Sequence, residues 1–95
     1  MLEENTIIRL FTEFGCNKHV LNGQPVFEKE GVYYRLTLLK SQNSYVIETA
    51  DSFDEAQKNR FEDDDIVEIS TSKDETYKRL REVLGKFYFE YIKNW

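Results

Sequence analysis

Apolar and polar residues alternate most clearly between residues 32 and 39, a run rich in β-branched and aromatic side chains. The alternation predicts a β-strand with one buried and one solvated face. The buried face would carry Val32, Tyr34, Leu36 and Leu38. The opposite face, with Tyr33, Arg35 and Thr37, is expected to meet solvent.

Shorter patterns on either side complete a small sheet. Polar residues 40–44 turn the chain into a second strand at residues 45–50, so the two strands form an antiparallel hairpin. Residues 26–28 begin a further strand, and residues 66–69 form a last, short one. The stretch 16–25 contains Asn22-Gly23 and Pro25 and is expected to be a loop with a brief extended piece around Val20.

Three segments have helical patterns. The first helix is expected over residues 6–14, with Asn5 as its N-cap, Gly15 at its left-handed end and a stripe of Ile7, Leu10, Phe11 and Phe14. Ser52 and Glu55 have the spacing of a capping box, which predicts a short helix to about Asn59 that buries Phe53 and Ala56.

Ser72 and Glu75 form a second capping-box pattern, and it opens the longest helix. Apolar residues at helical spacing define one face of this helix: Tyr77, Leu80, Val83, Leu84, Phe87, Tyr88 and Tyr91. The final residues 87–95 hold more aromatic side chains than one face can bury, so some are expected at the surface or against a partner.

These elements predict a single domain, residues 1–95, of the α+β class. We expect a small antiparallel sheet of three to four strands, with an N-terminal helix, a short middle helix and a long C-terminal helix packed on it. The composition, 40% hydrophobic and 15% aromatic, supports a folded core in a chain of 95 residues.

Negative charge is concentrated between Glu48 and Asp65, where eight acidic residues stand against Lys58 and Arg60. The local balance is −6, whereas the whole chain carries −5, so the remainder is close to neutral. The run Glu62-Asp63-Asp64-Asp65 repels itself and must be exposed, as a loop or a strand entry. This surface suits a basic partner, and the alternative interpretation is a solvated face that serves solubility and protects a sheet edge.

The rest of the composition narrows the class of protein. A net charge of −5 disfavours nucleic-acid binding, which needs clustered Lys and Arg. The N-terminus lacks a basic region and a sustained apolar run, so we expect no signal peptide, no membrane span and a cytoplasmic protein. Cys16 is the only cysteine, which agrees with a reducing compartment.

Catalytic and metal-binding patterns are weak. Cys16 and His19 have a C-x-x-H spacing, but a zinc site commonly needs a second such pair. The acidic run lacks the alternating ligands and the glycine of a calcium loop, and no Gly-rich phosphate loop is present. We therefore expect no enzyme, no cofactor and no metal.

The stretch 45–65 resembles small immunity proteins of Firmicutes polymorphic-toxin systems. The residues that carry the resemblance are Tyr45 to Asp51, Glu55-Ala56, Asn59 and Phe61 to Asp65. It implies a cytosolic protein that binds a cognate toxin domain and neutralises it, with the acidic block occluding a basic cleft. The expected partner-binding residues are Glu48, Asp51, Asp54, Glu62, Asp63, Asp64, Asp65, Tyr45 and Phe61.

Two other functions stay open. One is a phage or mobile-element accessory protein that inhibits a nuclease or regulator by mimicking DNA, which requires carboxylates spaced like phosphates along an extended face. The other is a structural homodimer that pairs through the C-terminal helix.

Overall fold

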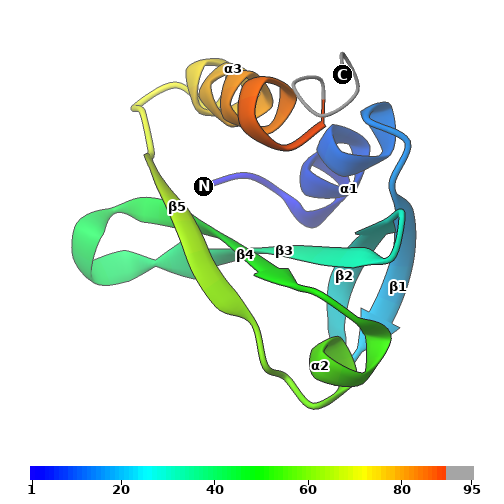
Figure 1. Cartoon of the computed structure of the whole chain (residues 1–95). Helices are drawn as coiled ribbons and strands as arrows, with labels where there is room; N and C mark the ends of the chain where they lie inside the picture. The colour runs from blue at the N-terminus through cyan, green and yellow to red at the C-terminus, as the bar shows by residue number, and fades with distance from the viewer. Residues whose placement is uncertain (90–95) are drawn as a thin grey trace.

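The computed structural model describes residues 1–89, which form an α+β domain (Figure 1). Five strands make one sheet, and three α-helices and a π-helical segment accompany it. In chain order the elements are α1 (Glu4–Glu13), β1 (Asn17–Leu21), β2 (Gln24–Lys29), β3 (Val32–Leu39), a 3-10 turn (Lys40–Gln42), β4 (Ser44–Ala50), α2 (Phe53–Gln57), β5 (Glu62–Glu68), α3 (Lys73–Val83) and the π-helix Leu84–Phe89.

The sheet is an antiparallel meander in which each strand pairs with the next along the chain, in the order β1-β2-β3-β4-β5. It has five strands where three to four were expected, because residues 17–21 form β1 instead of a loop. The turn residues Asn22 and Gly23 both have positive φ, 53° and 75°, as a two-residue hairpin turn requires. The Asn-Gly pair is therefore a hairpin signal, and the expected loop at 16–25 is wrong.

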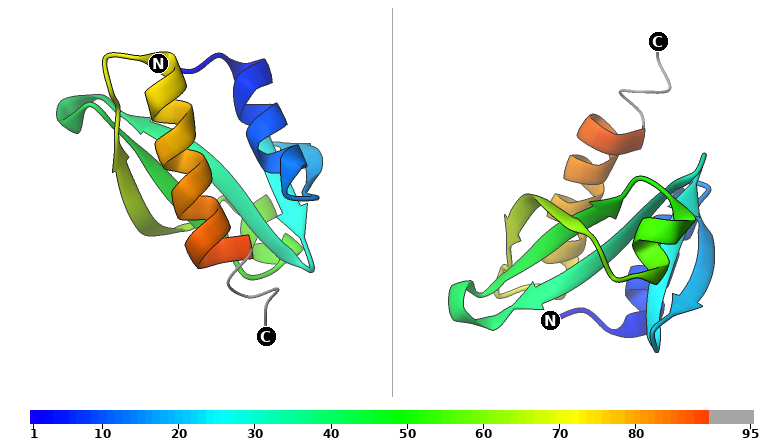
Figure 2. Two further views of the ribbon diagram at one scale, coloured as in Figure 1. Left: turned by 90° about the horizontal axis from the view of Figure 1, so that it is seen from above. Right: turned by 60° about the horizontal axis from the view of Figure 1, so that its bottom comes forward.

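Two layers cover the sheet unequally (Figure 2). Helices α1 and α3 lie side by side on one face, and the short α2 lies on the other face at one end. The core fills the space between the sheet and the two long helices, and Phe11 of α1 stacks on Phe27 of β2 with ring centroids 4.4 Å apart. The stripe expected on the first helix is confirmed, since Leu10 and Phe11 are fully buried and Ile7 and Phe14 pack against the core.

Local signals locate the helix starts well, with one exception. The Ser52 hydroxyl accepts a hydrogen bond from the Glu55 amide at 3.2 Å, and the Ser72 hydroxyl accepts one from the Glu75 amide at 3.3 Å. The first helix begins earlier than expected, at Glu4, so Asn5 lies inside its first turn and is not the N-cap. Gly15 has φ 85° and ends that helix in the left-handed conformation, as expected.

The C-terminal helix changes its winding at Leu84. From there the chain is π-helical, and the wider turn places Leu84 and Phe89, five residues apart, in the core. Phe89 packs on Phe14 at 4.9 Å and on Tyr34 at 5.0 Å, whereas Phe87 is 58% exposed. The assignment of Phe87 to the buried face is therefore wrong, and Tyr91 lies outside the described residues.

Helix α2 is shorter than expected and ends at Gln57. With so few residues only Ala56 reaches the sheet, where it is fully buried, and Phe53 remains 48% exposed. The expected burial of Phe53 is thus wrong. The last strand is longer than expected, because the acidic run itself belongs to β5.

Candidate functional site

A charged cluster on the sheet face away from α1 and α3 organises the acidic block. Arg35 of β3 donates from Nε to Glu48 Oε1 at 3.0 Å and also donates to the Asn59 side chain. The Thr37 hydroxyl donates to the same Glu48 oxygen. The guanidinium carbon lies 4.0 Å from the ring centroid of Phe61. Arg35 therefore fastens β3 and β4 to the segment between α2 and β5, and the expectation that it is solvated is wrong.

Asp63 of β5 extends this cluster. It stands opposite Glu48 in the strand register, and its hydrogen bond to Glu48 raises the pKa of Asp63. Burial raises the pKa of Glu48, but hydrogen bonds from Arg35, Thr37 and Asp63 together lower it below its usual value. The two shifts run in opposite directions because Arg35 stabilises the negative charge of Glu48, whereas Asp63 faces that charge.

A β-bulge divides the acidic run between two faces of the sheet. Ile47 pairs with Asp65 and Glu48 pairs with Asp63, so Asp64 is an extra residue on β5. The Thr49 hydroxyl donates to Asp64 at 2.6 Å, and the Tyr88 hydroxyl donates to Asp65. Burial and this bond to Asp65 raise the pKa of Tyr88. Asp64 and Asp65 thus turn toward the helices, while Asp63 turns to the opposite face.

Ion pairs compensate only part of the acidic block. Arg35 pairs with Glu48, Lys58 Nζ lies 3.1 Å from Asp54 Oδ2, and Arg60 Nη1 lies 3.9 Å from Glu55 Oε1. Within residues 1–89 the other five acids have no basic side chain at ion-pair distance. We call these five exposed residues the acidic edge: Asp51, Glu62, Asp63, Asp64 and Asp65.

Two residues expected to contact a partner are buried. Tyr45 is 2% exposed, and its hydroxyl accepts a hydrogen bond from the Leu2 amide at 2.7 Å. Glu48 is 8% exposed because Arg35 and Thr37 cover it. Both lie on the interior strand β4, which is buried along most of its length, so their assignment to the binding surface is corrected.

The remaining expected residues are accessible in different ways. Asp51, Asp54 and the four acids at the start of β5 are exposed, while Phe61 is half-buried under Arg35. Phe53 and Ile66 are large exposed apolar side chains; Phe53 was expected to be buried, and the sequence pattern did not single out Ile66. Ile66 could not have been assigned to this surface, because the bulge at Asp64 decides which face it occupies.

The Cys16 and His19 side chains do not form a joint site. Cys16 is buried in the core, and burial raises the pKa of its thiol to about 11. His19 lies on the other face of the sheet, near Tyr33, with Nε2 3.9 Å from Glu28 Oε1. In the described part of the chain no three His, Cys, Asp or Glu side chains are grouped so that they could hold a metal ion.

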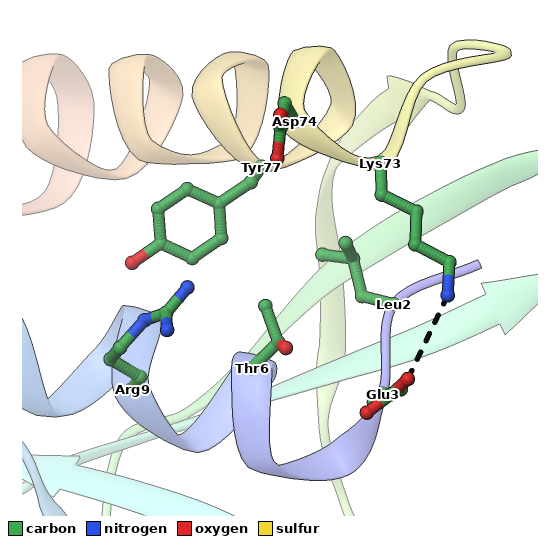
Figure 3. A pocket seen from close by; sticks show the side chains of 7 residues that line it. All are labelled: Leu2, Glu3, Thr6, Arg9, Lys73, Asp74 and Tyr77. Atoms are coloured by element: carbon green, nitrogen blue, oxygen red, sulfur yellow. Dashed lines mark ion pairs between the residues drawn. The ribbon is translucent and has the colours of Figure 1, made fainter.

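A hollow of about 370 Å³ opens between the starts of α1 and α3 (Figure 3). Lys73 Nζ lies 3.7 Å from Glu3 Oε1, and the Arg9 guanidinium lies 5.2 Å from the Tyr77 ring centroid. The lining residues are Leu2, Glu3, Thr6, Arg9, Lys73, Asp74 and Tyr77. Since positive and negative side chains balance there, the hollow selects neither charge, and its contacts mainly hold α1 to α3.

Comparison of the chain with models of known protein families, with curated proteins and with solved structures finds no match. Among residues 1–89, no helix combines the length and the apolar character needed to cross a membrane.

Proposed function

We propose that this protein is a non-enzymatic cytoplasmic binding protein, an immunity protein that neutralises a cognate toxin domain by covering a basic cleft with its acidic edge. The observation that carries the proposal is the set of five exposed carboxylates that lack ion-pair partners within residues 1–89. The resemblance of residues 45–65 to immunity proteins supports the same function.

The acidic edge is held by its surroundings before any partner arrives. Strand β5 is paired with β4 along most of its length, and Arg35 ties down Asn59 and Phe61 just before it. A preorganised surface loses little conformational entropy on binding. Uncompensated carboxylates on such a surface accelerate association with a basic partner and select for it.

Exposed apolar side chains beside the carboxylates supply contact energy. Phe53 lies at the start of α2, with its ring 6.0 Å from that of Tyr33, and Ile66 follows the acids on β5. Aromatic and large apolar residues at the centre of an interface contribute most of its affinity, and charges around them contribute specificity. The interface of this proposal therefore joins Phe53 and Ile66 to the acidic edge.

The bulge also bears on the choice between an immunity protein and a DNA mimic. A mimic needs carboxylates that follow one line, as phosphates do along a strand. Here Asp63 turns to one face of the sheet, and Asp64 and Asp65 turn to the other. The carboxylates therefore do not follow one line, which disfavours the DNA mimic.

The test compares two variants of equal charge. One variant neutralises the edge by Glu62→Gln, Asp64→Asn and Asp65→Asn, and the control carries Glu4→Gln, Glu30→Gln and Glu82→Gln, three exposed acids elsewhere. Each bait is used to capture partners from lysate of the producing organism, and captured proteins are quantified by mass spectrometry. We expect a toxin domain that the wild type and the control capture and the edge variant loses.

Two results would contradict the proposal. Equal capture by all three proteins would remove the acidic edge from the interface, and equal loss by both variants would show that only net charge matters. Co-expression of the captured domain with each bait then tests neutralisation, because cell growth should be rescued by the wild type and the control alone.

A further inference from the structure

The pairing between β2 and β3 stops early and leaves part of β3 without a neighbour. The two strands pair only at Phe27–Tyr34, Glu28–Tyr33 and Lys29–Val32. Strand β3 continues for five more residues, from Arg35 to Leu39, and pairs there with β4 alone. Within residues 1–89 no strand covers this half of β3 on the β2 side, and the β1-β2 hairpin turns away from it (Figures 1 and 2).

Pro25 gives the physical reason for the early stop. Glu30 and Gly31 form a two-residue turn with φ 53° and 86°, so the closing pair Lys29–Val32 exchanges main-chain hydrogen bonds. Such pairs recur at every second residue, and the next after Phe27–Tyr34 would join Pro25 to Leu36. Proline has no N–H to donate, and a hollow of about 210 Å³ lies where the ladder ends, bordered by Gln24, Pro25 and residues 35–38.

The same alternation identifies the unpaired groups of β3. Arg35, Thr37 and Leu39 direct their main-chain groups to β4, so Leu36 and Leu38 direct theirs outward. No turn or loop within the described part of the chain supplies a main-chain partner to Leu36 or Leu38. The outer strand β5 is protected by five acids, whereas residues 36–39 carry no charge.

We propose that a second copy of this chain pairs with this half of β3 in antiparallel fashion, about a two-fold axis at Thr37. Leu36 then faces Leu38 of the second copy, and both such pairs exchange main-chain hydrogen bonds. Thr37 faces its own equivalent, and Arg35 faces Leu39. The two five-stranded sheets join into one continuous sheet.

The free segment is self-complementary, which is why a second copy is the occupant. Outward-directed main-chain groups meet each other in this register, no like charges stand opposite, and threonine pairs are favourable across strands. The length of the free segment, residues 35–39, also matches this pairing. One residue further, Lys40 would face Tyr34 of the second copy, but Tyr34 already pairs with β2 of its own chain. The acidic edge lies two strands away on each copy and stays free, so this inference is independent of the proposed function.

The interface is small, and self-association is expected to be weak. Each copy carries −5, so added salt should strengthen the dimer by screening repulsion. The test follows mass by sedimentation equilibrium and the amide signals of Leu36 and Leu38 by NMR between about 0.02 and 1 mM, a range suited to weak contacts. We expect mass to rise toward the dimer and these two amides to shift with concentration.

A variant and its matched control locate the contact. Thr37→Lys places two ammonium groups opposite each other at the two-fold axis. Thr37 is exposed but its hydroxyl donates to Glu48, so far-UV circular dichroism and urea unfolding first verify that the variant is folded. Val20→Lys adds the same charge on β1, where Val20 is also exposed. We expect dimerisation to weaken more than tenfold in the first and to persist in the second. A concentration-independent monomer, or equal behaviour of the two variants, would overturn the inference.

Discussion

Arg35 and Glu48 allow the organisation of the acidic block to be tested by a single chemical change. Arg35→Met keeps the length of the side chain and removes the guanidinium, which leaves the Glu48 carboxylate with the Thr37 hydroxyl and Asp63. The two partners are only 16% and 11% exposed at their side chains, so water replaces the lost bonds poorly. The change also removes the contact between the guanidinium and Phe61.

The expected decrease in the free energy of unfolding follows from these contacts. Removing one partner of a buried ion pair costs about 3–5 kcal/mol, and partial exposure reduces that figure here. The lost cation–π contact adds roughly 0.5–2 kcal/mol. We expect Arg35→Met to lower the free energy of unfolding by about 2–4 kcal/mol, a large part of the roughly 5–15 kcal/mol typical of a domain.

A double-mutant cycle separates the pair from its surroundings. Glu48→Gln alone should cost about 1–2 kcal/mol, because the amide still accepts from Thr37. With both changes present no unpaired charge remains, so the loss should fall short of the sum by about 1–2 kcal/mol. Urea unfolding followed by far-UV circular dichroism gives all four free energies.

Amide hydrogen exchange can show which part of the structure opens more easily in the Arg35→Met variant. Since Arg35 also holds Asn59 and Phe61, amides between Lys58 and Asp63 should exchange faster in Arg35→Met than in the wild type. Two results would refute the role assigned to Arg35. One is strict additivity of the two changes in the cycle. The other is a decrease in the free energy of unfolding below about 0.5 kcal/mol for Arg35→Met, which is typical of surface changes.

Two further predictions concern titratable groups. Because the pKa of Asp63 is raised in the folded state, ionising it opposes folding as the pH rises, so Asp63→Asn should be more stable than wild type at pH 7. The gain should vanish as the pH falls below about 3, where the carboxyl is protonated in both states. Cys16, with a thiol pKa of about 11, should resist iodoacetamide at pH 8 until urea unfolds the chain, as thiol titration will show. Rapid labelling of the folded protein would contradict its place in the core.

Much of the fold could be predicted from short stretches of sequence. The alternation in residues 32–39 predicted β3 and its buried face, and both Ser-x-x-Glu patterns predicted helix starts. These signals depend on bonds within one element or one turn, so they need no knowledge of the rest of the chain. The Asn22-Gly23 turn belonged to the same class, and reading it as a loop lost β1.

Only the tertiary structure decided the faces of the acidic run and of the C-terminal helix. The bulge at Asp64 depends on how β5 aligns with β4, and it determines that Asp63 meets Glu48 while Asp65 meets Tyr88. The π-helical turn buries Phe89, whose ring packs on Phe14 and Tyr34. Sequence periodicity specifies the faces of one element, whereas register and helix phase are properties of two packed elements.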